Sequence, residues 1–243
     1  IKDNNNDINN NYDEYIKKVT GIHCPPWNYN WDGLLKTHNE DTLYNKSITF
    51  IRHGQYVHSN TDQGRILTEI GKEQAILTGQ RLANMDVIFD KILCSQLVRA
   101  KETMDIIVNE LKKNDKYKDK DIPIIYDKDL NEGFPIMCIP FNKKRDFNAW
   151  MNEVNNSSER IGNGFNTHMN RSINGNENIL FVGHGNVIRF YMCKLLQIPG
   201  QAWLRFAVNN ASITSIKLFK SGHISVQGFS DVGHFPSRLQ TFN

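Results

Sequence analysis

Two short apolar stretches of this chain each end in a histidine that lies beside a glycine. Ser47–Ile51 leads into Arg52-His53-Gly54, and Ile179–Val182 leads into Gly183-His184-Gly185. Short, continuous apolar runs are typical of strands that are buried on both faces of a parallel sheet. Groups that follow such strands line the crevice at the carboxyl ends of the sheet. We therefore expect the two histidines, which are far apart in the sequence, to face each other across one pocket.

Strand-like and helix-like patterns alternate along the rest of the chain. The predicted strands are Ser47–Ile51, Val87–Cys94, Ile122–Tyr126 and Ile179–Val182, with a closing hairpin of Ser212–Phe219 and His223–Gln227 turned at Ser221-Gly222. The predicted helices are Glu69–Ala83 with Thr68 as N-cap, Gln96–Lys112, a stretch around Ser158–Ser172, and Val187–Leu196. This alternation predicts an α/β fold, a three-layer sandwich with a mostly parallel central sheet flanked by helices.

The 243 residues divide into an N-terminal arm, residues 1–45, and one domain, residues 46–243. The start of the arm is rich in Asn and Asp, with a short helix expected near Asp13–Val19. No stretch approaches the roughly 20 apolar residues that span a bilayer. Because the chain starts at Ile1, we expect a truncated or processed form, with a membrane anchor possible only upstream. The net charge of +3 gives no reason to expect a nucleic-acid partner.

The four cysteines are scattered and form no CxxC pair; they are Cys24, Cys94, Cys138 and Cys193. This spacing favours free thiols in a reducing compartment over a disulfide framework. It also argues against a cysteine zinc site, and no Asp pair or Cys/His cluster of metal-ligand type is evident. We therefore expect neither a metal nor another cofactor.

The arm carries an unusually dense aromatic segment. Trp27, Tyr29 and Trp31 lie within residues 27–31, outside any periodic element. Aromatic side chains at this density need a surface to bury against. That surface is either the chain's own domain or a neighbouring subunit. The residues alone leave both alternatives open.

Charged residues follow the other predicted strands as well. Arg99 falls on the first turn of a helix that follows a strand, and Glu132 lies in a loop after another strand. Taken singly, each has an ordinary explanation as a surface charge. Together with Arg52, His53 and His184 they form a set of two histidines, two arginines and one carboxylate. A phosphate group, an anion with several oxygens, satisfies all of these groups.

The ordered motifs resemble the histidine phosphatase superfamily, which has the phosphoglycerate-mutase-like fold. The resemblance covers residues 46–236, and its motifs are Arg52-His53-Gly54, Leu67-Thr68-x-x-Gly71-x-x-Gln74-Ala75, Ser95-x-x-x-Arg99-Ala100-x-x-Thr103, Glu132 and Gly183-His184-Gly185. It implies that His53 becomes a phosphohistidine and that Glu132 transfers protons. It further implies that Arg52, Arg99 and His184, with Gly54 and Gly185, bind the phosphate, and that no metal takes part.

A closer resemblance is to the mitochondrial serine/threonine protein phosphatases of that superfamily. It rests on RHGQY, LTEIGKEQAILTGQRLA, Ala202-Trp203-Leu204-Arg205 and Asn209-Asn210-Ala211-Ser212-Ile213-Thr214. It implies a phosphoprotein substrate and a mitochondrial location, with the cytoplasm as the alternative. The W-D-P-N-W-D assembly motif of those proteins corresponds to residues 27–32, where Trp27, Asn30, Trp31 and Asp32 are kept. The resemblance therefore favours a homo-oligomer assembled through this segment.

Two departures favour hydrolysis over phosphate return to a substrate. Mutases of the superfamily carry Arg-His-Gly-x-Ser-x-x-Asn, but here Tyr56 replaces the Ser and Ser59 replaces the Asn. The mutase Glu-Arg-x-Tyr-Gly run is replaced by Asn131-Glu132-Gly133-Phe134. The alternatives are a cofactor-dependent phosphoglycerate mutase, a phosphatase of small phosphate esters, and an oligomeric scaffold with little catalysis.

Overall fold

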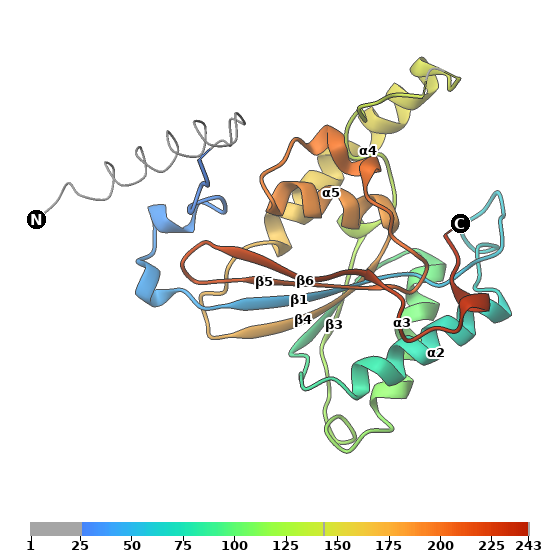
Figure 1. The fold of residues 1–243 in the computed structure, drawn as a ribbon, viewed down its shortest axis with the longest axis horizontal. Helices are drawn as coiled ribbons and strands as arrows, with labels where there is room; N and C mark the ends of the chain where they lie inside the picture. Colours follow the sequence, from blue (N-terminus) through green and yellow to red (C-terminus); the bar gives the residue numbers. More distant parts are fainter. Residues whose placement is uncertain (1–25, 143, 243) are drawn as a thin grey trace, which may run out of the picture.

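The computed structural model describes residues 26–142 and 144–242. The helix expected near Asp13–Val19 lies outside the described residues. Figure 1 shows a single twisted sheet with helices on both of its faces. The strands are β1 (Lys46–Arg52), β2 (Lys91–Ser95), β3 (Ile124–Asp127), β4 (Glu177–Gly183), β5 (Ile213–Leu218) and β6 (Ile224–Asp231). The described residues therefore confirm the predicted α/β class.

The sheet is mixed but mostly parallel, in the order β3-β2-β4-β1-β5-β6. The pairs β3·β2, β2·β4 and β4·β1 are parallel, whereas β1·β5 and β5·β6 are antiparallel. The antiparallel pair β5·β6 is the predicted closing hairpin. Gly222 lies in its turn with φ 87°, a conformation that favours glycine. Consecutive parallel strands are linked through helices, which is why the helices cover the sheet on both faces.

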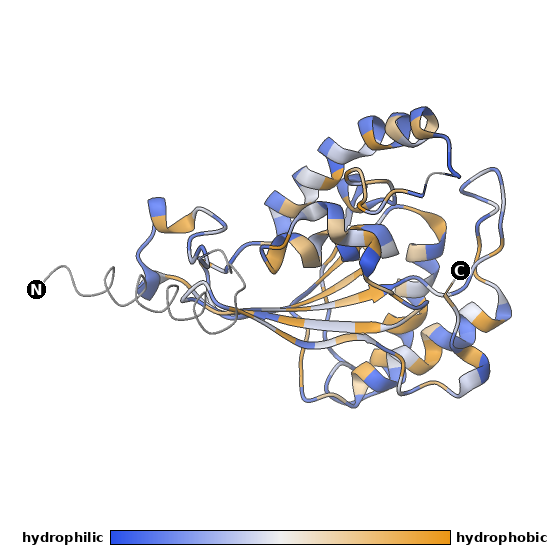
Figure 2. Ribbon diagram, turned by 45° about the horizontal axis from the view of Figure 1, so that its top comes forward, coloured by the Kyte–Doolittle hydropathy of each residue, from blue (hydrophilic) through white to orange (hydrophobic). Residues whose placement is uncertain are grey.

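Within the described residues, four long helices divide between the two faces of the sheet. They are α2 (Glu69–Ala83), α3 (Val98–Leu111), α4 (Phe147–His168) and α5 (Gly185–Leu195), and the short 3₁₀ turns are Leu34–Lys36, Glu40–Thr42, Lys128–Leu130, Gly200–Arg205 and Ser237–Leu239. Phe181 of β4 belongs to the hydrophobic cluster under α4 and α5, whereas Leu180 and Val182 belong to the cluster over α2 and α3. Figure 2 shows the strands as mostly hydrophobic ribbons between these two helical layers. Both faces of β4 are therefore buried, as its continuous apolar run predicts.

Several predicted boundaries were wrong. The second strand of the hairpin, for example, runs to Asp231 and not to Gln227. The strand expected over Val87–Cys94 begins only at Lys91, because the preceding residues approach as a loop in which the backbone N–H of Asp90 binds the carbonyl of Asn178. The helix expected around Ser158–Ser172 instead runs from Phe147 to His168. Asp146 caps its start by accepting from the backbone N–H groups of residues 148 and 149.

The helix α2 follows the prediction residue by residue. It spans Glu69–Ala83, and the side chain of Thr68 accepts a hydrogen bond from the backbone N–H of Gly71 at 3.0 Å. This bond satisfies one of the N–H groups that a helix start leaves without an intrahelical partner. The cap fixes where α2 begins and, with it, the position of the adjoining loop that follows β1.

The aromatic segment of the arm packs against the chain's own domain in this structure. The indole N–H groups of Trp27 and Trp31 both donate to the carbonyl oxygen of Gly222, at 3.1 and 3.0 Å. Asp32 forms a buried ion pair with Arg171, whose Nε lies 2.9 Å from the Asp32 carboxylate. Of the two surfaces that the sequence left open, the domain of the same chain is thus one that the segment contacts.

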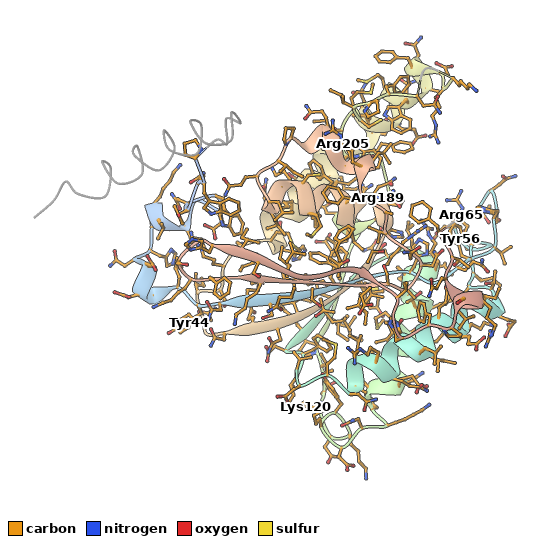
Figure 3. All side chains as sticks on the ribbon, viewed as in Figure 1. Tyr44, Tyr56, Arg65, Lys120, Arg189 and Arg205 are labelled. Carbon is orange, nitrogen blue, oxygen red and sulfur yellow. The ribbon has the colours of Figure 1, made fainter. Side chains whose placement is uncertain are left out.

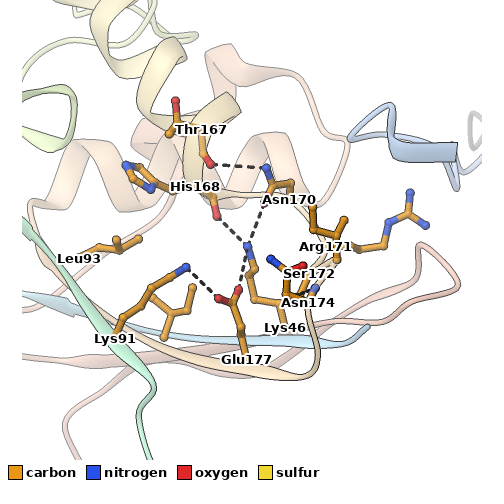
Figure 4. Close-up of a pocket in the computed structure, with 12 residues that line it drawn as sticks. Lys46, Lys91, Leu93, Thr167, His168, Asn170, Arg171, Ser172, Asn174 and Glu177 are labelled. Atoms are coloured by element: carbon orange, nitrogen blue, oxygen red, sulfur yellow. Dashed lines mark hydrogen bonds and ion pairs between the residues drawn. The ribbon is translucent and has the colours of Figure 1, made fainter. Parts of the chain in front are cut away.

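A polar cavity of about 180 Å³ lies near the same end of the sheet, where β1, β2 and β4 begin. Figure 4 shows Lys46, Lys91 and Glu177 on its floor, with the end of α4 above them. The Nζ of Lys91 lies 2.9 Å, and that of Lys46 3.5 Å, from the Glu177 carboxylate. None of the helices among the described residues is long and apolar enough to cross a membrane.

Candidate active site

The two histidines of the sequence pattern meet at the carboxyl ends of β1 and β4. These strands are parallel neighbours in which Arg52 pairs with Gly183, so the residues that follow them lie side by side. The backbone N–H of His53 binds the carbonyl of Gly183 at 2.9 Å. The ring centroids of His53 and His184 are 5.2 Å apart. The register between β1 and β4 therefore produces the pair.

The His53 ring is buried and fixed in one tautomer. Its Nδ1 lies 2.8 Å from the carbonyl oxygen of Gly54, to which Nδ1–H donates a hydrogen bond. The other nitrogen, Nε2, consequently carries the lone pair and accepts from the Nε–H of Arg99 at 3.3 Å. Burial, followed by the charges of Arg52 and Arg99, holds the pKa of His53 well below its usual value. The ring is therefore neutral near neutral pH, with Nε2 directed at the arginine.

Two guanidinium groups flank this ring. Arg99 comes from the first turn of α3, as expected, and its guanidinium lies over the Tyr56 ring at 4.9 Å and 3.5 Å from Asp62. Arg52, the last residue of β1, donates to the carbonyl oxygens of Val208 and Phe242 at 2.7 and 3.0 Å. Burial lowers the pKa of Arg52 to about 10, which still leaves it protonated near neutral pH.

His184 belongs to a hydrogen-bonded chain across the neighbouring strand. The Ser95 hydroxyl lies 2.8 Å from the side-chain oxygen of Asn131, to which it donates, and 2.7 Å from His184 Nε2, from which it accepts. His184 Nδ1 is buried and has no hydrogen-bond partner among the described residues. Burial, followed by the nearby Arg99, holds the pKa of His184 well below its usual value. Nδ1 is therefore the atom of this ring that is available to a ligand.

Glu132 faces the arginines from the loop after β3. Its carboxylate accepts from the backbone N–H of Gly133 at 3.0 Å. Burial raises its pKa and outweighs the opposing effects of that N–H and of the positive charges on Arg99 and Arg52. The loop is held by Arg160, which donates to the carbonyls of Asn131 and Glu132 at 2.8 and 3.0 Å. A carboxyl with a raised pKa beside cations is suited to give and take a proton.

The structure adds Asn186 and Arg189 of α5, two residues that sequence reasoning missed. Arg189 of α5 is buried, donates to the Asn186 side chain at 3.1 Å and interacts electrostatically with Glu132. Its guanidinium lies over the Phe242 ring at 5.4 Å, and that of Arg52 lies over the same ring at 5.7 Å. Figure 3 labels Arg189 on the same side of the sheet as α5. The i, i+3 spacing of Asn186 and Arg189 behind the second histidine was the available signal.

The glycines of the two motifs contribute in different ways. A Cβ at Gly54 would meet the backbone oxygen of Gly71 at 2.5 Å, so glycine is needed there for the packing of α2. The role in phosphate binding that the resemblance implies for Gly54 stays a prediction. A Cβ at Gly185 would lie 3.4 Å from the Nε of Arg52. Gly185 therefore leaves room for that guanidinium.

The site can perform chemistry on an anion. It brings together a neutral ring nitrogen, several guanidinium groups and a carboxyl with a raised pKa. Guanidinium groups can stabilise negative charge that develops on phosphoryl oxygens. Within residues 26–142 and 144–242, no group of three or more His, Cys, Asp or Glu side chains is arranged to hold a metal ion.

Sequence comparison identifies the family. Residues 48–137 and 140–231 match the model of the histidine phosphatase superfamily, branch 1. The chain belongs to this superfamily. It is similar to the mitochondrial serine/threonine-protein phosphatase Pgam5 of Drosophila grimshawi, with 37% identity over 246 residues, 90% of this chain and 81% of that protein. The Pgam5 of Drosophila melanogaster is 36% identical over 203 residues, 81% of this chain and 66% of that protein.

Two solved structures share the fold. A phosphoglycerate mutase from Plasmodium falciparum is 28% identical, with a TM-score of 0.54 over 80% of this chain and 96% of that one. A phosphoserine phosphatase from Entamoeba histolytica is 21% identical, with a TM-score of 0.52 over 78% of this chain and 98% of that one. At the latter identity the likeness concerns the fold alone.

Proposed function

We propose that this histidine phosphatase hydrolyses phosphoserine and phosphothreonine in proteins through a phosphohistidine on His53, without a metal. The observation that carries the proposal is the state of the His53 ring. Its Nδ1 is bound to the Gly54 carbonyl, and its Nε2 is unprotonated and faces Arg99. A neutral imidazole with an oriented lone pair is the form that attacks phosphorus. The Pgam5 relatives, which are named as serine/threonine-protein phosphatases, support the substrate class.

In the first step, the lone pair of His53 Nε2 forms a bond to phosphorus while the bond from phosphorus to the Ser or Thr oxygen breaks. Glu132 gives its proton to the departing oxygen, so the alcohol leaves neutral. Arg52 and Arg99 stabilise the charge on the phosphoryl oxygens. His184 takes up a proton from the solvent at Nδ1 as the dianion arrives and donates it in a hydrogen bond to a phosphoryl oxygen. It returns this proton to the solvent when phosphate leaves.

In the second step, the Glu132 carboxylate accepts a proton from a water molecule. The water oxygen bonds to phosphorus, the bond from phosphorus to Nε2 breaks, and inorganic phosphate is released. The electron pair returns to Nε2, so His53 is again neutral with its proton on Nδ1. Glu132 ends protonated, ready for the next substrate.

Tyr56 supports hydrolysis rather than mutase chemistry. Its ring lies edge-on to His53 at 5.1 Å between centroids and under the Arg99 guanidinium at 4.9 Å. At this position mutases carry a serine, whose hydroxyl could bond to a phosphoglycerate. The phenol ring instead gives the pocket an apolar wall, which suits the side chain of a phosphothreonine.

The test is phosphate release from a phosphothreonine peptide and from 3-phosphoglycerate, together with trapping of the phosphoenzyme. We expect release from the peptide, activity that survives EDTA, and a trapped phosphate that is labile to acid and stable to base. Mutase turnover that depends on 2,3-bisphosphoglycerate, with no phosphate released, would replace the proposal by the mutase alternative. Full loss of activity in EDTA would point to a metal.

We further propose a homo-oligomer that assembles through the Trp27–Asp32 segment, and a mitochondrial location as in the relatives' names. With Trp27 and Trp31 bound to Gly222, the outward side chains of this part of the arm are Tyr29 and Leu35, which are 43% and 37% exposed. Sedimentation of the Tyr29→Ala/Leu35→Ala variant should show a smaller mass than that of the wild type. An unchanged mass would remove these side chains from the assembly interface. Imaging of the tagged full-length chain tests the location.

A further inference from the structure

An exposed surface of mixed apolar and basic character lies beside the loop that carries Glu132. We call it the α4 patch, and it consists of Ile139, Lys144, Arg145, Phe147, Leu204 and Arg205. Its apolar members are unusually open to solvent, with Ile139 57%, Phe147 55% and Leu204 43% exposed. An apolar group of this kind, rimmed by charged side chains, is typical of a site that binds another molecule.

Arg205, Phe147 and Arg145 of the patch are each fixed by a contact with a neighbouring residue. Arg205 donates from Nε to the carbonyl oxygen of Ile139 at 3.2 Å. The Phe147 ring packs against Phe141 at 5.8 Å between centroids. The Arg145 guanidinium lies over the Trp150 ring at 5.2 Å. These contacts hold the side chains in place before any partner arrives, which lowers the entropy cost of binding.

Ring contacts connect the patch to the loop that carries Glu132. Trp150, under Arg145, stacks on Phe134 with their ring centroids 4.2 Å apart. Phe134 is two residues beyond Glu132 in the same loop, and its backbone N–H binds the Ser157 hydroxyl of α4 at 2.9 Å. Figure 3 shows Arg205 on the same side of the sheet as Arg189. A chain segment whose phosphorylated residue lies at His53 could therefore extend along the Phe134 loop to the patch.

The charges of the patch determine which partner fits. Lys144, Arg145 and Arg205 are all exposed and positive. The neighbouring carboxylate of Asp146 is already bound by the first backbone N–H groups of α4. A second copy of the same patch would bring like charges together, which is unfavourable at an interface. An acidic segment with an apolar residue complements both the cations and the exposed rings.

Building on the proposed function, we propose that the α4 patch is a docking site for an acidic, apolar segment of the phosphoprotein substrate. The patch binds residues remote from the phosphorylated side chain and takes no part in the chemistry. Its contribution is the same in the ground state and the transition state, so it lowers KM and leaves kcat unchanged. A small phosphate ester that cannot reach the patch is insensitive to it.

The experiment compares two phosphothreonine peptides, one with glutamates and a leucine after the phosphothreonine and one with lysines in place of the glutamates, alongside p-nitrophenyl phosphate. The variants are Lys144→Glu/Arg145→Glu and Phe147→Ser. Matched controls are Lys120→Glu and Ile173→Ser, which change an exposed cation and an exposed apolar side chain elsewhere. The charge reversal should raise KM for the acidic peptide about tenfold, and Phe147→Ser about threefold, with kcat unchanged.

The outcomes separate the docking site from the proposed function. A lower KM for the acidic peptide that disappears in the patch variants, with p-nitrophenyl phosphate unaffected, supports the site. Equal KM values for both peptides in the wild type would overturn the site and leave the phosphatase proposal standing. If the wild type hydrolyses p-nitrophenyl phosphate but neither peptide, both proposals fail. Loss of oligomer mass or of binding to anionic vesicles in the patch variants, with peptide KM unchanged, would assign the patch to another partner.

Discussion

The two ends of the central sheet carry similar positively charged side chains, which differ in the partners that they bind. At the end where β1, β2 and β4 begin, Lys46 and Lys91 share the Glu177 carboxylate (Figure 4). Arg171, at the same end, is paired with Asp32. At the carboxyl end, Arg52, Arg99 and Arg189 all interact with the Glu132 carboxylate, and Arg99 also lies 3.5 Å from Asp62. The described hydrogen bonds of Arg52 end on backbone carbonyls, that of Arg99 on the His53 ring, and that of Arg189 on an amide oxygen.

The difference separates charges that hold the fold together from charges that serve a ligand. A cation already paired with a buried carboxylate has little attraction left for an incoming anion. A guanidinium that binds carbonyl or ring nitrogen acceptors is fixed in place but keeps its attraction for an incoming anion. Four predictions test this contrast, in order of decreasing expected effect.

His53→Ala should lower kcat by about 10⁴-fold or more, because it removes the nitrogen that we propose attacks phosphorus. The measurement is phosphate release under saturating phosphothreonine peptide, with folding checked by thermal denaturation. The matched control is His223→Ala, which removes an exposed histidine near the opposite end of the sheet. A His53 variant that retains wild-type kcat would show that the carboxyl end of the sheet does not provide the nucleophile.

Asp32→Ala should lower the free energy of unfolding by about 3–5 kcal/mol, because it leaves the buried Arg171 without its carboxylate. Urea denaturation measures the change. Asp41→Ala is the control, since Asp41 is exposed and only 3.7 Å from Lys220, a pair worth about 0–1 kcal/mol. The kcat of the folded Asp32 variant should stay near that of the wild type, and a large fall in kcat would show that this end also serves catalysis.

Arg99→Gln should reduce kcat/KM by about 10²–10³-fold, because one donor to the phosphoryl oxygens is lost. It should also raise the pKa of His53, since a neighbouring positive charge that disfavours the imidazolium is removed. The acidic limb of the pH–rate profile should therefore move to higher pH. Arg238→Gln, which changes an exposed arginine paired with Glu73, is the control. An acidic limb that does not move would show that the charge of Arg99 does not affect the pKa of His53.

The stability of the wild type should fall as the pH drops below about 6.5. His53 and His184 have native pKa values well below that of an unfolded histidine, so the unfolded chain binds more protons in this range. Each contributes a loss of up to about 1.4 kcal/mol per pH unit, until its native pKa is reached. His53→Asn should remove one of these contributions and give a shallower slope. Equal slopes for wild type and variant would contradict a buried neutral His53.

Local sequence patterns predicted the parts of the fold that place the catalytic pair. Ser47–Ile51 is mostly apolar and Ile179–Val182 is wholly apolar because both faces of these strands are buried, and this property is visible without a structure. The N-cap at Thr68 was equally visible, because a cap depends on a few neighbouring residues. Residues close to the ends of such elements, including Arg99 on the first turn of α3, were therefore placed correctly.

Features that depend on distant contacts could not be predicted in this way. The first half of α4 is rich in polar residues, and the spacing of Trp150, Val154 and Ile161 becomes meaningful only once a sheet lies beneath them. An arginine on a helix is usually exposed, so its i, i+3 spacing from Asn186 is a weak signal, and Arg189 becomes distinctive only once Glu132 is seen near it. The arm could bind either of two surfaces, and only three-dimensional contacts relate Trp31 to Gly222.

The four tryptophans of the chain are divided between the same two regions. Trp27 and Trp31 share the Gly222 carbonyl, whereas Trp150 and Trp203 stack with their centroids 6.3 Å apart beside the Phe134 loop. Intrinsic fluorescence therefore contains one signal from the arm and one from the neighbourhood of the catalytic acid. Replacing either pair by phenylalanine would let the emission of the other report on arm attachment or on substrate entry in real time.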